Sequence, residues 1–271
     1  MTVVALWRYP VKSASGEVLS SAQLRRDGVV GDRRWAVAEE DGTLVSAKHP
    51  RLGGPLLQIL ARCDASSETT LVVPGRGCVV AGTPSADAAV SDWLGRPVYL
   101  TRDVKPGMRL SRRWPDLPEL VPEWEPTAHA GEEAVTAVAA GGRIDSFVDY
   151  GAVHLVTTRE LDALSATAGS PVDPRRFRPN VLIDGVDVLS PGMRVQIGDV
   201  VLRVNVPTPR CVVPKLAQRE VPEDLSVLTA VARQERKQVA TLGRAACVGV
   251  YATVEHSGCV HTGDGVQLGL A

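Results

Sequence analysis

The chain has 271 residues, of which 44% are hydrophobic and 23% are charged, and this ordinary globular composition excludes a disordered or fibrous protein. Its length allows one or two domains, and we expect two. The 30 lysines and arginines and 31 acidic residues give a formal net charge of -1, so no broad positive field is available for nucleic acid, although a few local arginines could still hold a small anion.

The first hundred residues alternate short runs of valine, leucine and isoleucine with glycine, proline and aspartate, which is typical of strands and hairpins. Asp41 and Gly42 lie between two apolar stretches and predict a two-residue hairpin turn. Residues 85–94 have apolar positions spaced by three and four, start with a serine and precede Gly95. This pattern predicts a short capped helix.

The strand pattern weakens between residues 112 and 143, where prolines recur every three or four residues from Pro115 to Pro126. We expect residues 112–143 to connect two domains. The stretch 114–126 is either a lid over a site or a plain surface loop, and both interpretations stay open.

Strand signals return in the second half of the chain. A strand-like HLVT leads into a helix that Thr157 or Thr158 could cap and that Gly169 would end. Residues 224–237 have helical periodicity and predict another helix. Many short strands at roughly ten-residue spacing predict a strand-rich α+β fold, built as a β-barrel with short helices.

The sequence also indicates the cellular compartment. The start, MTVVALWRYPVKS, lacks the marks of a signal peptide, and no window approaches the roughly 18 apolar residues that span a bilayer. The five cysteines form an odd set without a CxxC pair, which is typical of reduced thiols. We therefore expect a cytoplasmic protein with no membrane partner.

Cys211 is the first candidate for chemistry. It stands in VPTPRCVVPK directly after Arg210, whose guanidinium favours the thiolate, the form that attacks electrophiles and binds soft metals. An unremarkable buried cysteine is the commoner situation for such a local sequence and is the alternative here.

Two basic clusters could hold an anion. Residues 173–180, DPRRFRPN, place three arginines and an asparagine at a strand entrance, and planar guanidinium groups suit phosphate or carboxylate. Near the N-terminus, Lys12 and Ser13 follow a proline, and Asp32 could orient Arg33 through a salt bridge. A solvated basic turn is the alternative for the first cluster, and a purely structural role is the alternative for the second.

Several common sites are excluded. The five histidines include no HxH or HExxH pair, which favours satisfied or exposed histidines over a metal site. The chain also lacks the GxSxG, GxxxxGK[ST] and GxGxxG motifs, and this argues against the usual hydrolase, nucleoside-triphosphate and dinucleotide sites.

Seven segments, taken in chain order, resemble the MOSC family with its N-terminal β-barrel partner domain: LWRYPVKSASG, GDRRWAV, HLVTT, RFRPNVLIDG, RVQIGDVVLRV, PRC and GDGVQLG. That family includes the mitochondrial amidoxime-reducing component and bacterial reductases of N-hydroxylated bases. The resemblance implies a β-barrel-like α/β domain at residues 1–111, the proline-rich connector at 112–143, and a MOSC-type β-barrel with short helices at 144–271.

The resemblance also implies a molybdenum cofactor (molybdopterin), with Cys211 as the metal ligand and catalytic residue. Thiolate sulfur is a suitable ligand for a metal that the pterin already holds through sulfur. Further positions match those that contact the cofactor: Lys12, Ser13, Arg33, Thr157, Thr158, Arg178, Asn180 and Arg210.

The implied reaction is the reduction of N-hydroxylated or N-oxide small molecules. The chain shows no flavin fingerprint and no Cys₄ spacing for an iron-sulfur cluster, so an external reductase must donate the electrons. Two alternatives use the same fold. One is a carrier that stores the cofactor or passes sulfur through a persulfide on Cys211, and the other is a barrel that has lost its cofactor and binds another anion.

Overall fold

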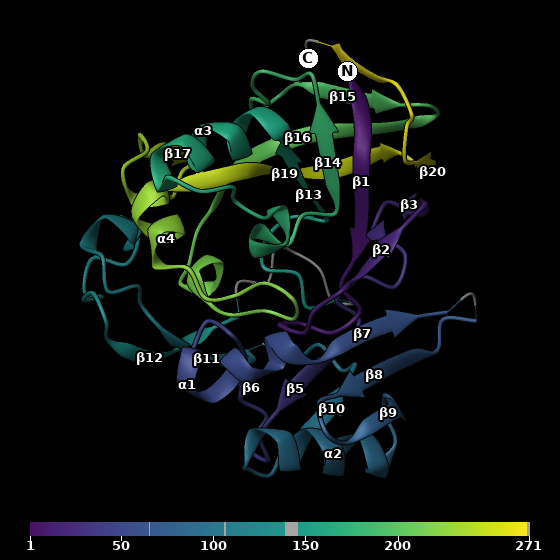
Figure 1. Ribbon diagram of the computed structural model, residues 1–271, viewed down its shortest axis with the longest axis vertical. Helices are drawn as coiled ribbons and strands as arrows, with labels where there is room; N and C mark the ends of the chain where they lie inside the picture. The colour runs from purple at the N-terminus through teal and green to yellow at the C-terminus, as the bar shows by residue number, and fades with distance from the viewer. Residues whose placement is uncertain (65, 106, 139–145, 270–271) are drawn as a thin grey trace.

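A large sheet joins strands from both ends of the chain in the computed structural model, which describes residues 1–64, 66–105, 107–138 and 146–269. Its eight strands have the order β2-β1-β14-β13-β19-β16-β15-β21 (Figure 1). Their bounds are β1 Thr2–Arg8, β2 Glu17–Leu19, β13 Val153–Thr157, β14 Val181–Asp184, β15 Arg194–Ile197, β16 Val200–Pro209, β19 Cys247–His256 and β21 Val266–Gly269. The strand-rich α+β class is therefore confirmed.

This sheet is covered on both faces. On one face its side chains share a core with the small sheet β20-β3-β4, whose strands are Gly258–His261, Ser21–Arg25 and Gly28–Val29. On the other face it packs against helices α3 (Thr158–Ala168) and α4 (Leu225–Ala232). Because side chains alternate between the faces of a strand, a strand covered on both sides is buried along its whole length. All five residues of β13 are buried, including the polar His154 and Thr157.

A second layer of structure is formed by most of the first half of the chain, which lies below the large sheet in Figure 1. A five-stranded sheet, β10-β5-β6-β11-β12, and a three-stranded sheet, β7-β8-β9, enclose another apolar core together with helix α2 (Pro84–Leu94). The bounds are β5 Ala36–Ala38, β6 Leu44–Val45, β7 Leu60–Cys63, β8 Thr69–Val73, β9 Gly77–Val80, β10 Tyr99–Thr101, β11 Arg109–Arg113 and β12 Glu133–Ala137. The hairpin β17-β18 adds Lys237–Val239 and Gly243–Ala245.

The three predicted helices are present, with changes at their ends. Helix α2, Pro84–Leu94, is capped by Thr83 rather than by the expected serine, because Pro84 occupies the first turn. Helix α3, Thr158–Ala168, is capped by Thr157 and ends at the left-handed Gly169, as predicted. Helix α4, Leu225–Ala232, is shorter than predicted. It ends before residues 233–237, and Lys237 is the first residue of strand β17.

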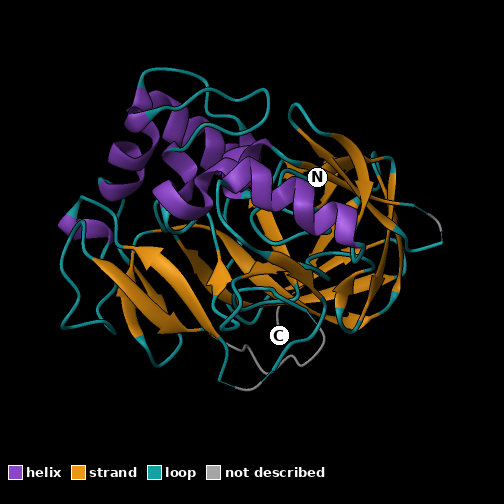
Figure 2. Cartoon of the chain, turned by 90° about the horizontal axis from the view of Figure 1, so that it is seen from below, coloured by secondary structure: helices purple, strands orange, loops and turns teal. Residues whose placement is uncertain are grey.

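Short helical turns complete the architecture: α1 Pro50–Gly53, η1 Gly54–Gln58, η2 Pro118–Leu120, η3 Pro174–Phe177 and η4 Val213–Lys215. Figure 2 shows the helices gathered along one side of the molecule. No helix among the described residues combines the length and apolarity that crossing a membrane requires.

The Asp41-Gly42 hairpin forms between β5 and β6, but its turn is longer than predicted. Glu39 N–H donates to Thr43 O, so the turn contains residues 40–42. The Asp41 carboxylate accepts a hydrogen bond from Thr43 N–H at 2.8 Å, and Gly42 adopts a positive φ of 81°. In this longer turn the Asp41 side chain bonds the backbone two residues further on, a contact that is typical of aspartate in turns.

The predicted connector contains regular structure. Strand β12 pairs antiparallel with β11, so the proline-rich residues 114–132 form the loop between two paired strands. Residues 139–143, the last part of the expected connector, lie outside the described residues. The division at residues 111 and 144 stays a prediction. The sheet order adds that β1 and β3 pair with strands of the second half, whereas β2 and β4 pair with β1 and β3.

We expect Gly28→Ala to destabilise the fold by at least about 2 kcal/mol. Gly28 has φ +102°, and a Cβ there would lie 2.4 Å from the carbonyl oxygen of Ala152, so both the backbone conformation and the space oppose a side chain. Gly75→Ala is the control. It has φ +70° with no atom within 4 Å of its Cβ position, and it should cost only about 1 kcal/mol. Equal losses in urea unfolding would contradict the close-approach argument.

Candidate functional site

Four distant segments meet at one cavity of about 80 Å³, which we call the basic cavity. Residues 9–13 follow β1, residues 31–35 precede β5, residues 173–180 lie before β14, and residues 206–215 include the end of β16. Six of the nine predicted site residues line this cavity: Lys12, Ser13, Arg33, Arg178, Arg210 and Cys211.

Lys12 is buried and is held by an acidic residue that the sequence analysis did not single out. Its Nζ donates to Asp149 Oδ1 at 2.7 Å and to Phe147 O at 2.9 Å. Lys48 binds the same Asp149 oxygen at 2.8 Å. Burial lowers the pKa of Lys12, although the negative charge of Asp149 acts in the opposite direction and raises it. Burial alone would raise the pKa of Asp149, but the charges of Lys12 and Lys48 hold it well below its usual range.

Ser13 shapes the cavity through its backbone and its hydroxyl. Its Oγ accepts a hydrogen bond from Ala47 N–H at 2.9 Å and lies 3.3 Å from Ser46 Oγ. This pairing ties the first segment to the turn that follows β6. The serine is therefore fixed in place by the protein itself, with 8% of its surface exposed.

Arg33 is oriented by Asp32, as the sequence predicted. The Asp32 carboxylate accepts from Arg33 Nη1 and, at 2.7 Å, from Tyr9 N–H. The Nη2 of Arg33 donates to Arg178 O at 3.0 Å. Asn180 does not line the cavity. Its Oδ1 accepts from His154 N–H at 3.0 Å and lies 3.4 Å from Arg33 Nη1, so it supports the site from behind.

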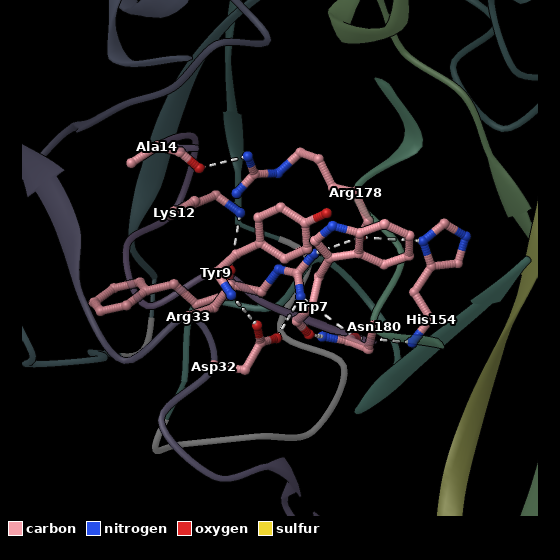
Figure 3. Close-up of polar contacts among 10 residues, drawn as sticks. Trp7, Tyr9, Lys12, Ala14, Asp32, Arg33, His154, Arg178 and Asn180 are labelled. Atoms are coloured by element: carbon pink, nitrogen blue, oxygen red, sulfur yellow. Dashed lines mark hydrogen bonds and ion pairs between the residues drawn. The ribbon is translucent and has the colours of Figure 1, made fainter. Parts of the chain in front are cut away.

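Arg178 and Arg33 lie on the ring of Tyr9 (Figure 3). The guanidinium carbon of Arg178 is 4.3 Å from the ring centroid and that of Arg33 is 4.9 Å from it. Arg178 Nη1 donates to Ala14 O at 2.5 Å, while its buried Nη2 has no hydrogen-bond partner among the described residues. Burial, together with the nearby charge of Arg33, lowers the pKa of Arg178 to about 10.

Three residues of the basic cavity adopt left-handed backbone conformations that side chains disfavour. The φ angles are 67° at Ser13, 48° at Arg33 and 54° at Arg178. They make up half of the six described residues other than glycine that have positive φ. Such strain of about 1–3 kcal/mol per residue persists where the surroundings over-determine the conformation, and it concentrates at functional sites.

Arg210 is joined to a buried histidine. Its Nη2 lies 3.3 Å from His154 Nε2, and its Nη1 donates to Phe177 O at 3.1 Å. Because a guanidinium only donates, the contact with Arg210 favours an accepting Nε2 and a proton on Nδ1, which faces Arg178 O at 3.4 Å. The Nε2 atom also lies 3.4 Å from Val248 O, a contact that favours the other tautomer. Burial and the charges of Arg210 and Arg33 hold the pKa of His154 well below 6.5, so the ring is neutral.

Cys211 follows the end of β16 and is half-buried. It packs against a small apolar group formed by Ala47, Leu57, Val213 and Leu216. The thiol therefore lies where the cationic residues of the basic cavity meet an apolar surface.

Thr157 and Thr158 are not among the residues that line the basic cavity, and their expected contact with a cofactor stays a prediction. Thr157 is fully buried and caps α3 through its hydroxyl, which accepts from Glu160 N–H at 3.2 Å. The Thr158 hydroxyl donates to Asp184 at 2.6 Å. Helix capping accounts for Thr157, because the first N–H groups of a helix need acceptors.

Sequence reasoning missed Lys48, Asp149, His154 and Tyr251, which all line the basic cavity. None of them stands in a motif with a second chemical group at recognisable spacing. Asp149 could have been found only through its partners, since Lys12 is 137 positions away. His154 was expected to be satisfied or exposed, and the structure places it in hydrogen-bonding distance of Arg210.

A second cavity of about 420 Å³ adjoins the first, and we call it the aromatic cavity. Its lining includes Trp114 and Trp124 from the proline-rich loop and Leu242 from the β17-β18 hairpin. Both cavities are lined by Lys48, Asp149, Pro209, Arg210, Cys211 and Tyr251. Cys211 is therefore accessible from both sides.

The basic cavity suits an anion. Its lining includes Lys12, Arg33, Lys48, Arg176, Arg178 and Arg210. Asp149 is the one carboxylate among the described residues that line it. Guanidinium groups bind phosphate and similar anions through paired hydrogen bonds, and a cysteine thiolate at the same wall is a ligand for a soft metal.

Family comparison finds two domains in this chain. Residues 1–93 match the MOSC N-terminal beta barrel domain, and residues 143–267 match the MOSC domain. The first match contains Lys12, Ser13 and Arg33, and the second contains Arg178, Arg210 and Cys211. The basic cavity is therefore built from both matched regions.

Curated relatives match nearly the whole chain at low identity. The human mitochondrial amidoxime-reducing components 1 and 2 are 25% and 24% identical, and each match covers 98% of this chain and 82% of the relative. The zebrafish (Danio rerio) component 1 is 26% identical, with 97% and 83% covered. Among solved structures, the YUAD protein from Bacillus subtilis is 16% identical, with a TM-score of 0.47 over 100% of this chain and 97% of that one.

The depressed pKa of His154 predicts a pH-dependent stability. The unfolded chain takes up a proton near pH 6.5 and the folded chain does so only at lower pH, so stability falls as the pH drops below about 6.5. Compared with His154→Gln, the wild type should lose about 1 kcal/mol of unfolding free energy between pH 7.5 and 5.5. Urea titrations at both pH values measure this difference. Parallel pH profiles for the two proteins would refute the assignment of a buried neutral imidazole.

Proposed function

Because this chain is a MOSC-domain protein with a MOSC N-terminal barrel domain, we propose that it holds a molybdenum cofactor through Cys211 and reduces N-hydroxylated or N-oxide small molecules. The observation that carries the proposal is the position of Cys211. It lies at the junction of the basic cavity, which six cationic side chains line, and the larger aromatic cavity. A metal ligand between an anion site and a substrate-sized space is what such a reaction requires.

The residues present fit an anionic cofactor. The surplus of cations over carboxylates, the unpartnered Nη2 of Arg178 and its lowered pKa all indicate that negative charge would stabilise the basic cavity. Sites for whole organic ligands usually measure about 300–1,000 Å³, so the 80 Å³ basic cavity suits the anionic group of a cofactor rather than a whole organic molecule.

In this proposal, different residues of the chain contact different parts of the cofactor. Lys12, Arg33 and Arg178 would neutralise the anionic parts of the cofactor, and Ser13 would help to hold them in position. Asn180 would support Arg33 from behind the cavity. Arg210 would supply positive charge beside the metal, with neutral His154 fixing its guanidinium. When bound, the cofactor supplies the two-electron metal chemistry that accepts the oxygen of an N–O bond.

The proposal includes a small-molecule substrate and an external electron donor, since this chain brings no flavin or iron-sulfur motif of its own. The relatives' names carry the terms amidoxime-reducing and mitochondrial. We take the first as support for the substrate class. The cytoplasmic location expected from the sequence stays a prediction.

Cys211→Ala should remove most of the molybdenum from protein purified from a host that makes the cofactor. The thiolate is the proposed protein ligand, and a half-buried thiol contributes little to packing, so the fold should persist. Metal content per chain and a thermal melting curve measure the two effects. Cys259→Ala is the matched control, because this exposed cysteine lies on β20, outside both cavities.

The outcomes separate the candidate functions. Metal in the wild type and in Cys259→Ala, but not in Cys211→Ala, supports the ligand assignment. Bound metal without oxidation of a reduced dye by an amidoxime would favour a carrier, or sulfur transfer through Cys211. Wild-type protein without metal would favour a barrel that binds another anion.

Arg178→Ala should weaken cofactor retention by about 1.5–3 kcal/mol, the usual contribution of hydrogen bonds to a charged group. The loss would appear as faster release of molybdenum during dialysis. Arg175→Ala is the matched control, since Arg175 lies in the same segment but pairs with Asp173 at 2.7 Å and does not line the basic cavity. Equal release from both variants would contradict the role given to Arg178.

A further inference from the structure

The proline-rich loop contributes an aromatic wall close to Cys211. Trp114 and Trp124 come from this loop and line the aromatic cavity together with Tyr150 and Tyr251. Cavities that bind organic ligands are lined mainly by apolar and aromatic side chains with a few polar groups that fix orientation. The aromatic cavity has this composition, whereas the basic cavity does not.

The aromatic side chains are held in place before any ligand arrives. Tyr150 and Tyr251 have ring centroids 6.1 Å apart at an angle of 31°, and both pack with Trp124 against one apolar cluster, Val206, Val239, Ala245 and Cys247. The residue before Trp124 is anchored, because the Glu123 carboxylate accepts from Arg244 N–H at 2.7 Å. Preorganised aromatic surfaces bind flat ligands at low entropic cost.

The cations of this cavity are already engaged by the protein. Arg112 lies over Trp114 with its guanidinium carbon 4.1 Å from the ring centroid. Arg113 binds Asp116 at 2.5 Å, and Lys48 binds Asp149. The surface that remains for a ligand is therefore mainly aromatic and aliphatic, which favours a flat apolar body over a second anion.

We propose that the aromatic cavity is the substrate subsite, that it receives the aryl body of an N-hydroxylated compound, and that Trp124 makes the chain prefer aryl over small alkyl substrates. This inference rests on the proposed function, because Cys211 marks the place where the N–O group would react. Tyr251 and Arg210 line both cavities and border the point where the polar head of the substrate would lie.

The test compares the binding of two amidoximes that share the reactive head. N-hydroxybenzamidine carries a phenyl ring and N-hydroxyacetamidine carries a methyl group. Calorimetric titration of the molybdenum-containing protein should give a dissociation constant at least about tenfold lower for the phenyl compound, as stacking and burial of a ring predict. Trp124→Ala should reduce this ratio about tenfold, and Trp124→Phe, which keeps a ring, should reduce it less than about threefold.

Two further variants guard against a folding defect. Leu242→Ala removes a cavity side chain that is 46% exposed, so it should fold and reduce the ratio about threefold. Trp93→Phe is the matched control, because Trp93 donates to Pro55 O at 2.9 Å and lies outside the aromatic cavity. It should leave the ratio at the wild-type value.

The outcomes distinguish this inference from the proposed function. Turnover of both compounds with an unchanged ratio in Trp124→Ala and Leu242→Ala would overturn the subsite and leave the reductase standing. Selective binding of the phenyl compound without turnover would support the subsite and count against the reductase. Loss of molybdenum from Trp124→Ala but not from Trp93→Phe would overturn the inference, since the cavity would then hold the cofactor.

Discussion

Buried positive charge is the constraint on which this site depends. Removing cations from water is costly, and the lowered pKa values of Lys12 and Arg178 reflect that cost. The protein meets part of it with one shared carboxylate, Asp149, with Asp32 beside Arg33, and with backbone carbonyls. Positive charge is left over after these contacts. An anion is the simplest group that would balance it.

The scaffold is arranged to hold this charge. Strand β1 lies between β2 and β14 in the large sheet. Residues 9–13, which follow β1, enter the space between the large sheet and the sheets formed by the first half of the chain. Ser13, Arg33 and Arg178 turn into the basic cavity through left-handed backbone conformations. Asn180, from the same segment as Arg178, contacts Arg33 and also accepts a hydrogen bond from the backbone N–H of His154 on β13. Because the three strained residues come from three segments, the fold as a whole must stabilise them.

The two cavities separate electrostatic binding from apolar binding. Charge is concentrated on the side of Lys12, Arg33 and Arg178, whereas the proline-rich loop supplies aromatic surface on the other side. Cys211 borders both. This separation allows one side to hold an anionic cofactor tightly while the other side varies with the substrate. Loops change more readily than paired strands, so the aromatic wall is the part in which related chains are free to differ.

Local sequence determined the strand-rich class, the three longer helices and most of the cationic residues, because periodicity, caps and basic motifs are written in neighbouring residues. It also indicated Asp32 as the partner of Arg33. Only the tertiary structure brought Asp149 to Lys12 and joined the proline-rich loop to Cys211. Contacts between residues so far apart in the sequence depend on how the sheets pack, and this packing has no signature in the local sequence.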